Sequence, residues 1–317
     1  MERLQRTLEA RQVRIYFCAI IVGGLAGMLV PGTSALQAAI NPVLALMLFA
    51  TFMQVPLASV GSALRDLRFI VALVLTNFVL LPLLVAGLIQ FAPDDPMLKL
   101  AVLMVLLAPC VDYVITFTHL GGGNARLLLA MTPLLLGLQM LLLPAYLWTM
   151  LGDEAAAMLR AEPYLHAFVW LIGLPLLAAA VLQRLRRRSV AGKAWAPLVD
   201  LLPVPATALV LFIVVASVMP QIGQAQSAAL TAWPIYGMYG LLAPLAAWVV
   251  ARVLRLASPA GRALGFSAAY RNSLVILPLA FAVPGGVPLV PAVILTQTIT
   301  ELLFLPLYLR VMPRAWS

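Results

Sequence analysis

The stretch "LLAPCVDYVITFTHLGGGN", from Leu106 to Asn124, places polar residues inside a long apolar run. The residues around it have the composition of a membrane-spanning helix, yet Pro109, Cys110 and Asp112 lie close together within it. A charge at a lipid-facing helix centre costs about 2.5–3.5 kcal/mol on insertion scales. We therefore expect Asp112 to face protein or a water-filled cavity, in a helix that Pro109 interrupts.

The composition indicates an all-α integral membrane protein. Hydrophobic residues make up 64% of the 317, and charged residues 10%, against about 25% in soluble domains. Lipid offers the backbone no hydrogen-bond partners, so spanning segments of about 20 residues must be helical. The sequence predicts ten such helices, near 13–31, 36–56, 69–91, 97–119, 125–151, 164–184, 197–220, 230–251, 260–283 and 288–309.

Positive charges alternate between successive loops. Lys and Arg gather near residues 3–14, 184–193, 252–262 and 310–314, whereas the intervening loops hold most of the acids. Cytoplasmic loops of membrane proteins carry the excess of Lys and Arg. The pattern predicts a multi-pass protein of the plasma membrane, the cell inner membrane, with both termini in the cytoplasm. This orientation explains the net charge of +9 without a nucleic-acid partner.

Two pairs of similar segments indicate an internal repeat. "QMLLLPAYL" from Gln139 and "ELLFLPLYL" from Glu301 lie 162 residues apart, and "PVLALMLF" from Pro42 resembles "PATALVLF" from Pro205. We predict two five-helix repeats, residues 1–155 and 160–317. An odd helix number inverts the second repeat, as in secondary transporters whose sites are built from interrupted helices. The same offset leads from the polar break in helix 4 to that in helix 9, so these two interrupted helices are expected to cross.

Three charged residues fall well inside the predicted spans: Asp112, Arg271 and Glu301. Asp112 and Arg271 are expected to pair at the crossing, either within a site or as an ion pair that holds the helices in register. The sequence contains neither metal-ligand spacing nor a nucleophile–His–acid set. We therefore expect no metal, no cofactor and no enzyme activity.

Four motifs resemble the bile acid/arsenite/riboflavin transporter superfamily. "APCVDYVITFTHLGGGNARLLLAMTP" looks like the fourth helix of the arsenite efflux permeases, with Cys110 on their cysteine. "FSAAYRNSLVILPLA" is similar to the ninth helix, with Asn272 on an asparagine. "ILTQTITELLFLPLYL" resembles the tenth, with Glu301 on its glutamate, and "TNFVLLPLL" resembles the third, matching Asn77 and Pro82. The resemblance implies a secondary transporter nearest to the arsenite permeases.

The sequence also departs from both branches of that superfamily. Pro109 stands where arsenite permeases usually carry an arginine, and Asp112 matches neither pattern. Ser267 and Arg271 stand where the bile acid:sodium symporters carry a Glu and a Gln as sodium ligands. A fixed cation at Arg271 repels sodium, so we expect transport without a sodium requirement.

Three functions remain open at this point. The first is efflux of arsenite or a related metalloid in exchange for protons, because the Cys110 thiol suits trivalent arsenic and Asp112 or Glu301 can carry a proton. The second is sodium- or proton-coupled symport of a small organic anion, with Arg271 as a bidentate clamp. The third is a membrane receptor that does not transport, which the lack of a visible effector domain disfavours.

The candidate site draws residues from both repeats. The expected substrate contacts are Cys110, Asn272, Arg271, Ser273 and Glu301; the proton carriers are Asp112 and Glu301; the supporting polar residues are Asn77, Thr116, Gln139 and Gln297. The expected partners are a small-molecule or metalloid solute and the lipid bilayer, and a homo-oligomer is left open.

Overall fold

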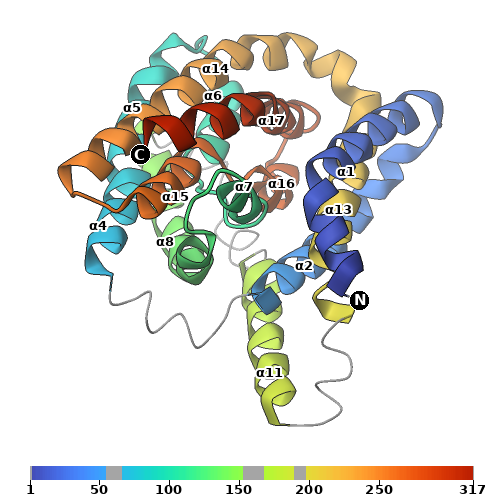
Figure 1. Ribbon diagram of the computed structural model, residues 1–317. Helices are drawn as coiled ribbons and strands as arrows, with labels where there is room; N and C mark the ends of the chain where they lie inside the picture. Colours follow the sequence, from blue (N-terminus) through green and yellow to red (C-terminus); the bar gives the residue numbers. More distant parts are fainter. Residues whose placement is uncertain (1, 55–65, 153–167, 189–197, 317) are drawn as a thin grey trace. The chain divides into compact units, whose positions relative to one another are not determined.

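The computed structural model describes residues 2–54, 66–152, 168–188 and 198–316, which form helices and turns with no strand among them (Figure 1). Six stretches in these residues are long and apolar enough to cross a membrane: Arg11–Leu29, Thr33–Gln54, Leu67–Phe91, Ala125–Leu151, Ala225–Val253 and Leu289–Ala315. The expected all-helical membrane class is confirmed. The other predicted spans are divided by a break or reach outside the described residues, so the count of ten stays a prediction.

The chain forms two compact units. The first comprises Met1–Val55 with Ala161–Gln224, and the second Pro56–Arg160 with Ala225–Ser317. Each unit therefore combines a segment from the first half of the chain with one from the second half. The predicted repeat boundary, between residues 155 and 160, lies outside the described residues.

The first unit is held together by close helix packing. Its helical segments are α1 (Glu2–Leu29), η1 (Thr33–Leu36), α2 (Gln37–Gln54), η4 (Phe168–Gly173), α11 (Leu174–Arg188), α13 (Pro203–Val218) and η5 (Met219–Gln221). Helix α13 packs against α1 and α2, and α11 packs against α2. A Cβ atom at Gly23 would lie 2.7 Å from the carbonyl oxygen of Phe212, and one at Gly27 would lie 2.8 Å from that of Ala216. Two glycines one turn apart thus let the α1 and α13 backbones approach closely, as small residues do between membrane helices.

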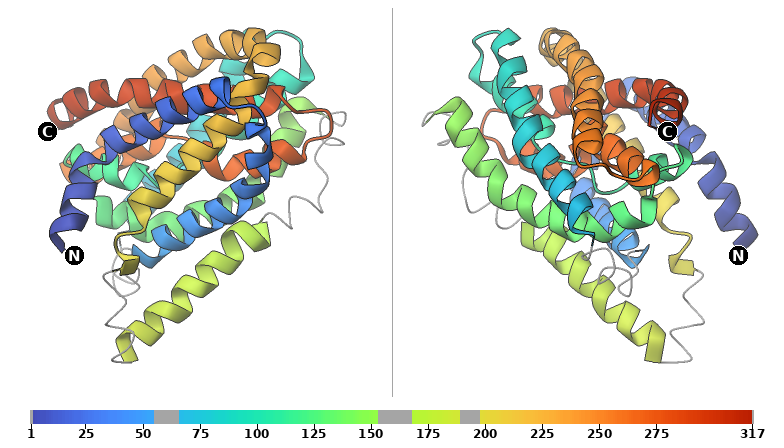
Figure 2. Two further views of the ribbon diagram at one scale, coloured as in Figure 1. Left: turned by 90° about the vertical axis from the view of Figure 1, so that its right-hand side faces the viewer. Right: turned by 60° about the vertical axis from the view of Figure 1, so that its left-hand side comes forward.

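The second unit contains every candidate site residue. Its helical segments are α4 (Leu67–Leu75), η2 (Thr76–Leu80), α5 (Leu81–Leu88), η3 (Ile89–Phe91), α6 (Pro96–Leu106), α7 (Val114–Leu120), α8 (Ala125–Leu151), α14 (Ile222–Val253, in this unit from Ala225), α15 (Ser258–Ala269), α16 (Ser273–Ala282) and α17 (Leu289–Ala315). Helices α14 and α17 are long and unbroken, whereas α6–α7 and α15–α16 are pairs of short helices (Figure 2).

Local sequence signals explain where α6 begins and ends. The Asp95 carboxylate accepts hydrogen bonds from the backbone N–H groups of Met97 and Leu98, at 2.9 and 3.2 Å. Pro96 occupies the first helical turn, where its missing N–H costs nothing. The helix ends at Leu106, shortly before Pro109, which has no N–H to donate to another helical turn.

Glycines shape the turn between α7 and α8. A Cβ atom at Gly121 would lie 2.3 Å from the ring of Phe266 in α15, so a larger residue there would have to displace that ring. Gly122 has φ +67°, in the left-handed region that glycine adopts at little cost. Asn124 then caps α8 by accepting a hydrogen bond from the Leu127 N–H at 3.1 Å. Helix α7 ends at Leu120, beside the end predicted near residue 119.

Candidate functional site

Two unwound segments pair at the centre of the candidate site. Helix α6 ends at Leu106 and α7 begins at Val114, and helix α15 ends at Ala269 and α16 begins at Ser273. The Cys110 N–H donates to the Tyr270 carbonyl at 3.2 Å, and the Asn272 N–H donates to the Ala108 carbonyl at 2.8 Å. Breaks in both helices, and the proximity of Cys110 to Asn272, were predicted from the sequence and are confirmed.

Cys110 and Asp112 form a buried thiol–carboxylate pair. The Cys110 Sγ donates to Asp112 Oδ1 at 3.0 Å, and the Tyr113 N–H donates to the same oxygen at 2.6 Å. Cys110 is 0% exposed and Asp112 6%. No described residue hydrogen-bonds to Asp112 Oδ2. The carboxylate therefore orients the thiol with one oxygen and keeps the other available.

Glu301, in α17, gathers three donors from separate parts of the second unit. It accepts hydrogen bonds from the Tyr113 hydroxyl, from Gln297 Nε2 at 2.7 Å and from the Arg271 N–H at 3.0 Å. One carboxylate thus ties both unwound segments to α17. Tyr113 was missed by the sequence reasoning; its position beside Asp112 in the polar interruption was the available signal.

Arg271 does not pair with Asp112, and this expectation is corrected. Within the described residues no ion pair joins the two side chains. The Arg271 Nη2 instead donates to Asn77 Oδ1 at 2.9 Å and to the carbonyls of Ser267 and Ala268 at 3.0 and 2.9 Å. The guanidinium therefore turns back along its own chain, towards the preceding helical turn, while its backbone N–H reaches Glu301.

The other candidate residues divide into those inside and those outside this network. Asn272 Nδ2 donates to Gln139 Oε1 at 3.2 Å. Ser273 Oγ accepts from Thr298 Oγ1 at 2.7 Å, so Thr298 is a further member that the sequence did not suggest. Thr116 lies half-buried in α7 and takes no part in these hydrogen bonds among the described residues.

Several buried oxygen atoms at the site lack a donor. Among the described residues, Asp112 Oδ2, Asn272 Oδ1 and Gln297 Oε1 accept no hydrogen bond. Buried acceptors of this kind are normally satisfied by protein, water or ligand. Two donors at the same site, Gln139 Nε2 and Arg271 Nε, also lack a partner among the described residues, so the arrangement suits a solute that both donates and accepts hydrogen bonds. The described part of the chain holds no cluster of three His, Cys, Asp or Glu residues fit for a metal ion.

A small cavity borders the acidic end of the network. It measures about 10 Å³ and is lined by Gln297, Thr300, Glu301 and Phe304, among others, which is space for about one water molecule. A larger pocket of about 510 Å³ shares Thr300 and Phe304 with it. Thr300 and Phe304 therefore line both cavities.

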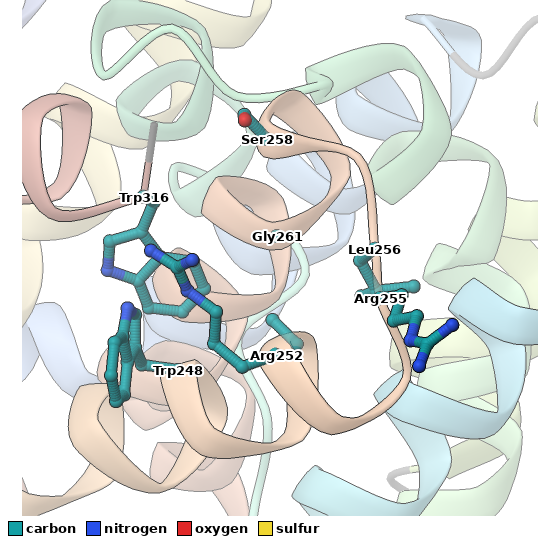
Figure 3. Close-up of a pocket in the computed structure, with 8 residues that line it drawn as sticks. Trp248, Arg252, Arg255, Leu256, Ser258, Gly261 and Trp316 are labelled. Carbon is teal, nitrogen blue, oxygen red and sulfur yellow. The ribbon is translucent and has the colours of Figure 1, made fainter.

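A different pocket, of about 280 Å³, lies at the end of α17 and is lined by none of the candidate residues (Figure 3). Trp248 Nε1 and Arg252 Nη2 donate to the Ala315 carbonyl at 3.1 and 3.4 Å. The Trp316 indole packs on α15, where a Cβ atom at Gly265 would lie 2.7 Å from the ring. These contacts anchor the end of α17 to α14 and α15.

The chain matches a known protein family. The sequence model of the Sodium Bile acid symporter family matches residues 41–228, more than half of the chain. The matched range includes the Cys110–Asp112 pair and ends before Arg271 and Glu301. No curated protein matches the sequence.

Proposed function

The chain belongs to the sodium bile acid symporter family, whose members are transporters rather than enzymes, and from this premise we propose that its solute binds where the two unwound segments pair. The family and the apolar helices together indicate that the chain is a multi-pass membrane protein that transports a small molecule. Transporters place their sites where broken helices expose backbone groups. The unwound segments that contain Cys110 and Asn272 interrupt two helices in this way, and two backbone hydrogen bonds hold the segments together.

The observation that carries the choice of solute is the Cys110–Asp112 pair. Arsenous acid is a neutral trivalent oxyacid, and soft thiol sulfur suits trivalent arsenic. As the Cys110 sulfur attacks arsenic, the Asp112 carboxylate at 3.0 Å takes the thiol proton and delivers it to the departing hydroxyl. One As–O bond breaks, one S–As bond forms and water leaves. The hydroxyl groups that remain supply donors for the open oxygens of Asn272 and Gln297.

The alternative function, transport of an organic anion, required Arg271 to bind the anion, and in this arrangement the Arg271 side chain is already engaged by protein oxygens. Arg271 is 0% exposed, and its Nη1 and Nη2 groups donate to protein oxygens. Among the described residues only Nε lacks a partner, so a bidentate clamp on a carboxylate or sulfonate would require an Nη group to leave its acceptor. The open oxygens of Asp112, Asn272 and Gln297 are acceptors, which an anion without donors cannot satisfy, although Gln139 Nε2, unpaired within the described part of the chain, is a donor that it could use. The geometry therefore favours metalloid efflux over anion symport.

Glu301 is proposed as the coupling group. It is 4% exposed and joins both unwound segments to α17. The small cavity beside it holds about one water molecule, and the neighbouring pocket shares Thr300 and Phe304 with it. A proton that reaches Glu301 by this route weakens its hold on the Arg271 N–H, because a neutral carboxylic acid is the poorer acceptor. Protonation of Glu301 would thus loosen the link between the unwound segment of Arg271 and α17, and in this way couple proton uptake to solute release. Asp112 is proposed as the second proton carrier.

The inverted repeat, residues 1–155 and 160–317, is proposed on matching hydrogen bonds. Tyr146 donates its hydroxyl proton to the Phe78 carbonyl at 2.5 Å, and Tyr308, 162 residues later, donates to the Gly240 carbonyl at 2.6 Å. The two acceptors are also 162 residues apart. The same offset exchanges the two hydrogen bonds between the unwound segments, Cys110 to Tyr270 and Asn272 to Ala108. Equivalent hydrogen bonds at the same offset support two structurally equivalent repeats in the chain.

Membrane orientation is proposed from the charge pattern. Both termini lie in the cytoplasm, and the protein sits in the plasma membrane, because Lys and Arg crowd the loops on that side. Single cysteines placed near residue 188 and near residue 94, in a background without Cys18 and Cys110, test this. A membrane-impermeant thiol reagent added outside intact cells is expected to label the second position alone.

The test of function is flux in proteoliposomes. Arsenite and taurocholate are offered separately, with and without imposed sodium and pH gradients. Arsenite uptake driven by the pH gradient, and lost on Cys110→Ser, is the expected result; serine is the matched control because it keeps a hydrogen-bond donor and removes the sulfur. Taurocholate uptake that requires sodium and survives Cys110→Ser contradicts the proposal.

A further inference from the structure

The guanidinium of Arg271 lies where two half-helices end. Its Nη2 donates to the carbonyls of Ser267 and Ala268, in the last turn of α15, at 3.0 and 2.9 Å. Its Nη1 donates to the carbonyl of Leu106, the last residue of α6, at 3.4 Å. Carbonyls at helix C-termini carry the negative end of the helix dipole. Two such ends therefore converge on one buried cation.

Every hydrogen-bond acceptor of this guanidinium is a neutral oxygen. Asn77 Oδ1 completes the set at 2.9 Å, and Asn77 is held in place because its Nδ2 donates to Ser267 Oγ and to the Leu73 carbonyl, each at 3.1 Å. The Tyr239 ring faces the guanidinium, with its centroid 5.4 Å from Cζ. Within the described residues no carboxylate forms an ion pair with Arg271.

We propose that the Arg271 guanidinium is a built-in cation, occupying a site whose oxygens would otherwise bind a monovalent metal ion such as Na⁺. Hard cations take backbone carbonyl and side-chain amide oxygens as ligands, and transporters bind coupling cations at the ends of broken helices. The carbonyls of Leu106, Ser267 and Ala268 with Asn77 Oδ1 are such a set. The residues present do not fit a sodium ion here, although the family name implies one.

The repulsion is large enough to decide the outcome. A sodium ion about 4 Å from the guanidinium, at an effective dielectric of about 20, loses roughly a thousandfold in affinity. Removing the positive side chain therefore changes the site from one that rejects sodium to one that binds it. The inference goes beyond the proposed function, because it does not depend on which solute is carried.

The experiment compares Arg271→Ala and Arg271→Gln, which vacate the cation position, with Arg271→Lys, which keeps a tethered cation. Thermal unfolding of the purified, solute-free proteins is measured in 300 mM sodium chloride and in 300 mM choline chloride. Sodium is expected to raise the melting temperature of the alanine or glutamine variant by roughly 5 °C, as binding well above Kd does. The unsubstituted protein and Arg271→Lys are expected to melt at the same temperature in both salts.

Arg262→Ala is the matched control, since Arg262 also donates to carbonyls, those of Gly122 and Pro313 at 3.2 and 2.9 Å, outside the crossing. It is expected to melt equally in both salts. Equilibrium dialysis with ²²Na⁺ gives a second readout, with binding expected only after Arg271 is replaced by a neutral residue. The inference is overturned if the alanine and glutamine variants show no stabilisation by sodium. It is also overturned if neither variant yields folded protein in either salt. Because solute is absent, the result is independent of the flux test.

Discussion

Replacing Glu301 with glutamine separates its charge from its hydrogen bonds. Glutamine has the same length, so its oxygen can accept from the Arg271 N–H and from Gln297, while its NH₂ group donates to the Tyr113 oxygen. We expect Glu301→Gln to cost about 1 kcal/mol or less. Alanine leaves three buried donors without a partner, at about 1–2 kcal/mol each, or about 3–6 kcal/mol in total. The corresponding fall in melting temperature is roughly 10 °C for Glu301→Ala and under about 4 °C for Glu301→Gln.

The assay joins this stability measurement to flux. Glutamine cannot take up or release a proton, so an imposed pH gradient is expected to stop driving uptake by Glu301→Gln while exchange of solute for solute continues. A glutamine variant that melts as low as the alanine variant refutes the hydrogen-bond argument. A glutamine variant that still responds fully to the pH gradient refutes Glu301 as the coupling group.

Three further predictions concern the paired unwound segments. Cys110→Ser is expected to abolish arsenite-induced protection against thermal unfolding, measured in purified protein, while its melting temperature without arsenite stays within about 4 °C of the parent. The losses of stability on Asp112→Ala and Arg271→Ala are expected to add within about 0.5 kcal/mol in the double variant, because the two side chains share no hydrogen-bond partner among the described residues. A coupling above about 1 kcal/mol would instead indicate that the two side chains form an ion pair. Replacing sodium with choline is expected to leave flux in proteoliposomes unchanged, and flux that returns only with sodium moves the protein to sodium-coupled symport.

The position of the two unwound segments was predictable because polar residues in lipid are costly. Pro109 and Asp112 could not belong to an unbroken lipid-facing helix, and the offset of 162 led from Cys110 to Asn272. The paired unwound segments meet both expectations. The number of spans was less accessible, since a broken helix and a short helix leave similar apolar runs.

Side-chain direction was not predictable from the sequence. Arg271 and Asp112 are of opposite charge and lie on neighbouring segments, yet the guanidinium turns to the carbonyls of Ser267 and Ala268. Backbone carbonyls freed by a helix end carry no signal in the sequence, so an ion pair was the simpler expectation. Tyr113 was missed for a related reason, because its hydroxyl partner lies 188 residues away in the chain.

Thiol accessibility tests most directly whether the solute binds at the paired unwound segments. Cys110 is buried and Cys18 is exposed, so the measurement uses a Cys18→Ser background in which one thiol remains. A membrane-impermeant methanethiosulfonate reagent is added to right-side-out and to inside-out vesicles. We predict slow modification of Cys110 from each side, slowed further by arsenite and unaffected by taurocholate. Modification from one side only, or at a rate that arsenite does not change, would contradict an alternating path through Cys110.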